Sequence, residues 1–160
     1  MAPAQIPRRK LTPQSRDVFS KSKRSQVMAL IRAKDTKPEM AVRQTLHALG
    51  FRFRLHDRSL PGRPDILLCR HGTIIQVKGC FWHSHRCLKG RMPYGNRPYW
   101  IAKLSANQAR DRRNERLLRK LGWRVRTIWE CAIRRWPRAE LAARLSSLLS
   151  PGHGGPRSTR

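Results

Sequence analysis

The stretch PDILLCRHGTIIQVK (residues 64–78) decides the fold, because it contains two short apolar runs separated by a turn. Residues 65–69 and 73–78 are rich in Ile, Leu and Val, and the short RHG segment joins them, so this pattern predicts a β-hairpin. Just upstream, residues 51–55 alternate between apolar and basic side chains, which is typical of a strand with one buried face. Three strands are therefore expected in succession.

Helices are predicted on both sides of these strands. The remaining expected elements are a helix around residues 25–33, a helix from the TKPE capping box at Thr36, a basic helix at 99–121, an alternating strand at 123–129 and a final helix at 137–149. The order α-β-β-β-α-β-α predicts an α/β fold with a mixed sheet flanked by helices. One domain is expected at residues 25–149, between a flexible basic arm (1–24) and a disordered basic tail (150–160).

The charge is strongly unbalanced, with 36 Lys and Arg against 9 Asp and Glu and a formal net charge of +27. Such a chain repels itself when compact, so a polyanionic partner is expected. Nucleic acid is favoured over a membrane, because the basic residues are spread along the chain and no apolar run could span a bilayer. The start of the sequence lacks the apolar region of a secretory signal, which favours a cytoplasmic location.

Cysteine and histidine side chains are concentrated in GCFWHSHRC (residues 79–87). The candidate ligands are Cys80, His83, His85 and Cys87 in this stretch and Cys131 after the last predicted strand. A structural zinc site takes four such ligands, and three cysteines with one histidine complete it. Spacing does not choose between His83 and His85, and the spare imidazole would suit proton transfer. The competing interpretation is reduced core thiols, which is the expected role of Cys69.

A carboxylate stands at the start of the hairpin. Asp65 opens the first strand, and Gln76 and Lys78 lie on the second. This pattern resembles the PD-(D/E)xK motif of restriction-type nucleases, in which carboxylates bind Mg²⁺, although Gln76 replaces the second acid. Glu39 occupies the third helical position of the capping box, and capping alone explains it.

Several motifs together resemble the very short patch repair (Vsr) endonuclease family over roughly residues 20–135. They are PGRPD (61–65), GCFWH (79–83), the H-x-C of His85 to Cys87, NQARDRRN (107–114) and GWRV…WEC (122–131). The resemblance implies a restriction-endonuclease-like fold and a strand-specific DNA endonuclease. Its implied substrate is duplex DNA with a T:G mismatch from deaminated 5-methylcytosine. The implied reaction is a nick 5′ of the thymine, which initiates very short patch repair.

The resemblance also implies roles for individual residues. Asp65 and the backbone carbonyl of Val77 would bind Mg²⁺, His83 would activate water, Glu39 would be an active-site carboxylate and Lys78 would act electrostatically. Structural zinc would be held by Cys80, His85, Cys87 and Cys131. The implied DNA contacts are intercalation by Phe81, Trp82, Trp100 and, from the other groove, Met28, and helix contacts by Lys103, Asn107 and Arg110. Without the resemblance, at least two of the three aromatic residues would be assigned to the core.

Two rival functions remain open from the sequence. One is a non-catalytic, zinc-stabilised nucleic-acid-binding module, which explains the charge and the cysteines but not the FWH triplet. The other is a nuclease of the same fold with broader nicking or restriction specificity. Mismatch-repair proteins are further candidate partners, and we expect a monomer that is associated with the nucleoid.

Overall fold

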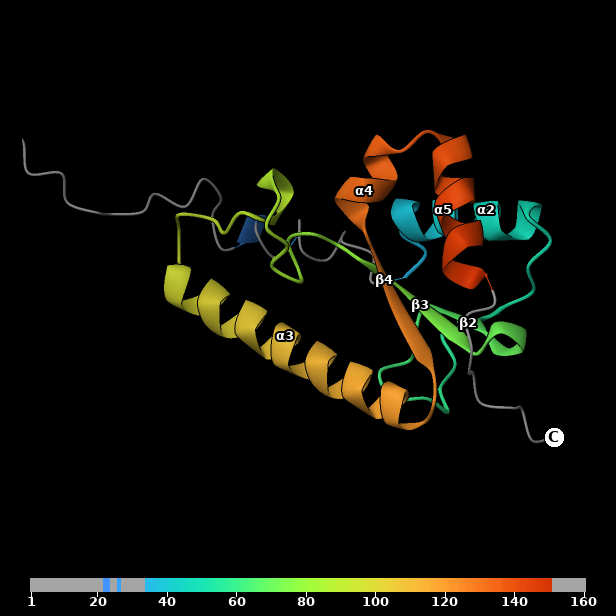
Figure 1. Ribbon diagram of the computed structural model, residues 1–160. Helices are drawn as coiled ribbons and strands as arrows, with labels where there is room; N and C mark the ends of the chain where they lie inside the picture. Colours follow the sequence, from blue (N-terminus) through green and yellow to red (C-terminus); the bar gives the residue numbers. More distant parts are fainter. Residues whose placement is uncertain (1–21, 24–25, 27–33, 151–160) are drawn as a thin grey trace, which may run out of the picture.

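The computed structural model describes residues 22–23, 26 and 34–150. The elements in chain order are helix α2 (Lys37–Ala48), strands β1 (Arg54–Leu55), β2 (Ile66–Leu68) and β3 (Thr73–Lys78), helix α3 (Arg97–Lys120), strand β4 (Arg124–Trp129), and helices α4 (Glu130–Arg135) and α5 (Arg138–Leu149). Figure 1 shows the sheet in the centre, with α3 on one side and α2, α4 and α5 on the other. The described residues therefore form three layers.

The four strands lie in the order β1-β2-β3-β4. β2 and β3 form the predicted antiparallel hairpin, in which Ile66 pairs with Ile75. β4 joins β3 in parallel, with Trp129 beside Lys78, after the long crossover through α3. Parallel neighbours require such a crossover, because a tight turn joins only antiparallel strands. The carboxyl ends of β3 and β4 therefore meet at the same edge of the sheet.

Each face of the sheet buries its own apolar cluster. The larger cluster, toward α2, α4 and α5, comprises Val42, Leu46, Ile66, Leu68, Ile75, Ile128, Ile133, Leu141, Leu145 and Leu149. The smaller cluster, toward α3, comprises Leu67, Ile74, Leu118 and Val125. Burial of each such side chain stabilises the fold by roughly 1.5–3 kcal/mol. Strand β2 is buried on both faces, which explains why its sequence is continuously apolar rather than alternating.

Helix α2 begins at the predicted capping box. Thr36 is the N-cap, and its hydroxyl oxygen accepts a 3.5 Å hydrogen bond from the backbone N–H of Glu39. The same hydroxyl donates to Oε1 of Glu39 at 3.0 Å, while Oε2 accepts from the backbone N–H of Asp35 at 3.0 Å. After the helix, Gly50 has φ +80°, the left-handed conformation predicted for the helix end.

The α/β class, the mixed sheet and the order of elements from α2 onward are confirmed, with three differences. The strand predicted at residues 51–55 is reduced to β1, and Phe51 and Phe53 instead pack against the larger cluster. Helix α4 was not predicted. Strand β4 buries Val125 on one face and Ile128 on the other, because helices cover both faces of the sheet. The restriction-endonuclease-like assignment stays a prediction from the resemblance.

Several predicted features fall almost entirely outside the described residues. They are the basic arm (1–24), the first helix (25–33) with Met28, and the basic tail (150–160). Among the residues that the structure describes, no helix is long and apolar enough to cross a membrane.

Candidate functional site

A cleft of about 900 Å³ opens at the edge of the sheet where β3 and β4 end. Its walls come from the start of α2, the PGRP turn before β2, the end of β3 with the following loop, α3 and the start of α4. The acidic residues that line it are Glu39, Asp65, Asp111 and Glu130; the basic ones are Lys37, Arg63, Lys78, Lys103, Arg110 and Arg134. The chain has only nine acidic residues, so four in one cleft mark it as the candidate active site.

Asp65 lies directly before β2, beside the end of β3. Its Oδ2 accepts a 2.8 Å hydrogen bond from the backbone N–H of Val77. The β2–β3 register, extended by one residue, sets Asp65 opposite Gln76 on the face toward α3. Burial raises the pKa of Asp65, and the negative charge of Glu39 raises it further, whereas the Val77 hydrogen bond opposes both effects. A divalent cation would stabilise this half-buried carboxylate in its ionised form.

The neighbouring oxygen atoms suit such a cation. Gln76 Oε1 is buried and has no hydrogen-bond partner among the described residues, and both Gln76 and Val77 line the cleft beside Asp65. Carboxylate and carbonyl oxygens are the ligands that Mg²⁺ prefers. The residues present at the end of β3 therefore fit a hard divalent cation.

His83 and Asp111 form a hydrogen-bonded pair in the cleft. Nδ1 of His83 contacts Oδ2 of Asp111, and the Lys78 ammonium lies 3.6 Å from the same oxygen. Burial favours a higher pKa for Asp111. The hydrogen bond and charge of His83 and the charge of Lys78 outweigh this effect, so the pKa of Asp111 lies below its usual range. The contact between Asp111 and Nδ1 fixes the orientation of the His83 ring and leaves Nε2 available for proton transfer.

The sequence reasoning did not select Asp111. The signal was nonetheless present, because Asp111 lies within the NQARDRRN motif and follows Lys103 and Asn107 at intervals of four residues. Residues at i, i+4 and i+8 share one face of a helix. All three line the cleft, so the helical spacing of the DNA-contact candidates would have pointed to this carboxylate.

Glu39 is buried and engaged by several protein groups. In addition to its capping bonds with Thr36 and Asp35, its Oε2 accepts a 3.0 Å hydrogen bond from the guanidinium of Arg43. Arg43 also contacts Asp35 at 2.5 Å and the ring of His56 at 2.9 Å. This network holds α2 against the segment before β2. Glu39 lies at the cleft, and its contacts are those of a positioning group that also raises the pKa of Asp65.

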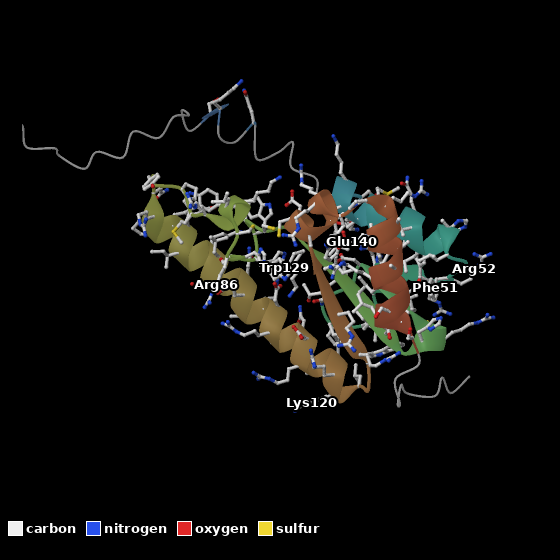
Figure 2. The ribbon with its side chains drawn as sticks, turned by 45° about the horizontal axis from the view of Figure 1, so that its top comes forward. Phe51, Arg52, Arg86, Lys120, Trp129 and Glu140 are labelled. Carbon is white, nitrogen blue, oxygen red and sulfur yellow. The ribbon has the colours of Figure 1, made fainter. Side chains whose placement is uncertain are left out.

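The structure brings together the four residues predicted to bind zinc. Ligand atoms of Cys80, His85, Cys87 and Cys131 all lie within 4.8 Å of one another. His85 stacks on Trp129 at 4.2 Å, which turns its Nδ1 to within 3.5 Å of the Cys131 sulfur. In Figure 2, Trp129 lies between α3 and the layer of α4 and α5, so the cluster connects the loop after β3 to the end of β4. Three sulfurs and one nitrogen at these separations fit tetrahedral zinc.

The thiols of the cluster differ in acidity. Burial is the main effect that raises the pKa of Cys80 to about 12, whereas the hydrogen bond with His85 is the main effect that lowers the pKa of Cys87 to about 6. His85 contacts the cysteines and His83 contacts Asp111, so the two histidines have different partners. Cys69 is half-buried against the smaller apolar cluster, in agreement with its predicted packing role.

The aromatic residues form a cluster beside the cleft. Phe81 makes edge-to-face contacts with Trp82 at 5.0 Å and with Trp100 at 5.1 Å. Trp100 is only 7% exposed, while Tyr99, which the sequence reasoning missed, packs on it and is 51% exposed. Trp82, Tyr99 and Trp100 line the cleft, so the aromatic cluster lies partly in the interior and partly at the surface of the cleft.

Asn107 ties α3 to the aromatic loop. Its Nδ2 donates a 3.2 Å hydrogen bond to the backbone carbonyl of Trp82, and Asn107 is 8% exposed. Lys103 and Arg110, the other predicted DNA contacts of α3, are exposed and line the cleft. Of these three residues, the two cations therefore face solvent and Asn107 serves the packing of the loop.

Comparison with known proteins finds relatives that are named as endonucleases and nicking enzymes. Residues 16–89 match the family described as DNA mismatch endonuclease Vsr. The type II nicking enzyme V.XorIIP of Xanthomonas oryzae pv. oryzae is 44% identical over 84% of this chain and 98% of its own length. The type II nicking enzyme V.NmeAIP of Neisseria meningitidis serogroup A is 44% identical over 74% of this chain and 84% of its own. The DNA mismatch endonuclease Vsr of Escherichia coli K12 is 42% identical over 74% of this chain and 76% of its own. The chain therefore belongs to the DNA mismatch endonuclease Vsr family.

Proposed function

We propose that the protein is a Mg²⁺-dependent DNA endonuclease that nicks duplex DNA 5′ of the thymine in a T:G mismatch. The observation that carries the proposal is the half-buried Asp65 in the same cleft as the His83–Asp111 pair. A half-buried carboxylate and an oriented imidazole would provide the two functions that phosphodiester hydrolysis needs, a metal ligand and a proton acceptor. The relatives named as nicking and mismatch endonucleases support the same chemistry.

In this proposal Asp65 and the backbone carbonyl of Val77 would hold the cation. When bound, Mg²⁺ would stabilise negative charge on the phosphate oxygens. Nε2 of His83 takes the proton of the attacking water, while the Asp111 carboxylate stabilises the imidazolium that results. Lys78 acts electrostatically in this proposal, because its ammonium lies 3.6 Å from Asp111 and favours the ionised form of that carboxylate.

The zinc cluster has a structural role in this proposal. Cys80, His85, Cys87 and Cys131 would fill all four positions of a tetrahedral ion, and a closed site of this kind supports folding rather than hydrolysis. His83 follows Cys80 by three residues. Zinc would thus hold the loop that carries the catalytic imidazole.

Mismatch selectivity is proposed to come from the aromatic cluster. Phe81, Trp82 and Trp100 would enter a base step, and a mispaired step costs less to unstack than a paired one. The contacts among these rings are replaced by contacts with bases, which offsets part of the cost of opening the cluster. Lys103 and Arg110 would bind phosphates and fix the register of the duplex.

The same relatives motivate a second candidate, a nicking enzyme with broader specificity, because several of them are named only as type II nicking enzymes. Interaction with mismatch-repair proteins, a monomeric state, and association with the nucleoid are parts of the proposal that stand on the family alone. A purely DNA-binding module is disfavoured, because it gives no reason for the Asp65, His83 and Asp111 arrangement.

The test compares two duplexes that differ only in one base pair, T:G or C:G, with the purified protein, Mg²⁺ and end-labelled strands. We expect one nick, in the thymine strand, 5′ of the mismatch, and a rate on C:G at least about 100-fold lower. Equal nicking of both duplexes would favour the broader nicking enzyme. Binding without cleavage of either duplex, with any divalent cation, would refute endonuclease activity.

A further inference from the structure

The turn before Asp65 contains an arginine in an unusual backbone conformation. Residues 60–63 form a β-turn closed by a 3.2 Å hydrogen bond from the Arg63 N–H to the Leu60 carbonyl. Gly62 has φ +77°, as the third position of a type II turn after Pro61 requires. Arg63, the next residue, has φ +48°. Positive φ is unfavourable for a long side chain, and residues held in this way are concentrated at functional sites.

Contacts with α3 hold this turn in place. A Cβ at Gly62 would lie 2.5 Å from Nδ2 of Asn114, so the turn packs directly against the helix and only glycine fits there. On the other side, Pro64 is buried and Asp65 is bonded to β3. Arg63 is therefore fixed between two anchored segments, and its backbone conformation is imposed by them.

The side chain of Arg63 has no role in packing. It is exposed, it lines the cleft, and no carboxylate among the described residues lies within ion-pair distance of it. Two other cations of the cleft are neutralised locally: Lys78 by Asp111 at 3.6 Å and Arg134 by Glu130 at 2.9 Å. The Arg63 guanidinium, two residues from the half-buried carboxylate of Asp65, is therefore available for an anion in the cleft.

We propose that Arg63 binds the backbone phosphate that reacts beside Asp65, and that the strained turn exists to present its guanidinium there. The proposal deepens the endonuclease function above and rests on it. Guanidinium matches phosphate geometry with two parallel N–H donors, which an ammonium does not, so arginine is the residue expected at such a position. Because the backbone of Arg63 is held by the turn, its contact fixes the phosphate orientation and raises the rate more than the affinity.

The experiment separates the side chain from its backbone strain. Three variants are compared with the wild type: Arg63→Gly, which relieves the positive φ; Arg63→Gln, which removes only the charge; and Arg63→Lys, which keeps it. Arg52→Gln is the matched control, since Arg52 is exposed at the right edge of the molecule in Figure 2, outside the cleft. Each protein is assayed for single-turnover nicking of a T:G duplex with Mg²⁺, for duplex affinity with Ca²⁺ across a salt series, and for thermal unfolding.

We expect Arg63→Gly and Arg63→Gln to slow nicking roughly 10- to 100-fold, with a smaller loss of affinity, and Arg63→Lys to lie between them and the wild type. Arg63→Gly should unfold at the same temperature as the wild type or higher, because strain is removed. A merely structural arginine would not combine full stability with lost nicking. Arg52→Gln should nick within about twofold of the wild type.

Nicking by Arg63→Gln or Arg63→Gly within about twofold of the wild type overturns the proposal. An equal loss in Arg52→Gln also overturns it, because the effect would then be general electrostatics. If the wild type itself does not nick DNA, the proposed endonuclease function is refuted. The salt series still tests whether Arg63 contacts a phosphate. A slope of log affinity against log salt that falls by about one in Arg63→Gln supports a phosphate contact, and an unchanged slope refutes it.

Discussion

The substitution Asp65→Asn should stabilise the metal-free protein while abolishing its nicking activity. Burial raises the pKa of Asp65 in the folded state. The stability contributed by the protonated carboxyl is therefore fully present below the pKa of the unfolded chain and is lost as pH rises through the folded value. At neutral pH the ionised carboxylate opposes folding, by about 1.4 kcal/mol for each unit of the pKa shift.

Asparagine removes this cost and keeps the geometry, because its carbonyl oxygen can still accept the hydrogen bond from the Val77 N–H, which is 2.8 Å long in the wild type. We expect the unfolding temperature of Asp65→Asn to exceed that of the wild type by roughly 2–5 °C in metal-free buffer at pH 7.5. Mg²⁺ at ten times its Kd should stabilise the wild type by about 1.4 kcal/mol and leave the variant unchanged. Added Mg²⁺ should therefore reduce the difference in unfolding temperature between the two proteins, or reverse its sign.

The assay is thermal unfolding with and without Mg²⁺, in buffer freed of divalent cations by resin, since a soluble chelator would also remove zinc. Asp57→Asn is the control. The carboxylate of Asp57 accepts two hydrogen bonds from Ser59, which lower its pKa, so its loss should not stabilise the protein or alter the Mg²⁺ response. The reasoning is refuted if Asp65→Asn unfolds at or below the wild-type temperature without metal, or if Mg²⁺ stabilises both proteins equally.

Three further substitutions test the rest of the site. Asp111→Asn removes the charge that balances a protonated His83, so single-turnover nicking should fall roughly 10²- to 10⁴-fold while duplex affinity holds; retained activity would contradict the pairing. Cys131→Ala leaves three ligands, and metal analysis should show loss of zinc, with an unfolding temperature lower by roughly 10 °C or more; unchanged zinc content would reassign the ligand. Glu39→Gln weakens a buried contact with Arg43 and should cost about 1.5–3 kcal/mol in denaturant unfolding; an unaffected midpoint would show that capping alone holds this residue.

Local signals were sufficient for most of the fold. The capping box at Thr36, the hairpin around Gly72 and the end of α3 at Gly122 are each encoded within a few residues, and each is observed. The strand predicted at residues 51–55 was too long. Alternation of apolar and polar residues indicates that one face is buried, but it does not indicate that a neighbouring strand is present to form hydrogen bonds. Phe51 and Phe53 are half-buried by packing against the larger cluster, and only residues 54 and 55 pair with β2.

The candidate site shows a different limit. Ligand types and spacing indicated a metal cluster within residues 79–87, and Cys131 joins it because β4 runs parallel to β3 and ends beside it. The parallel pairing of β3 and β4 therefore explains why the three thiols lie close together. The choice between His83 and His85 required knowing which side chain each ring contacts, and those partners come from distant elements, α3 for one and β4 with α4 for the other.

Asp111 shows why the partner was the missing information. A carboxylate within a basic helix has a simple local explanation, an ion pair with a neighbouring arginine, and Glu115 with Arg119 forms such a pair one turn further along α3. Asp111 instead turns into the cleft, where it contacts a histidine and a lysine from the other side of the sheet edge. The side chain of Asp111 is also less exposed than that of Glu115, at 17% against 29%. The contacts that a carboxylate makes with other elements, rather than its residue type, therefore distinguish Asp111 in the cleft from the locally ion-paired Glu115.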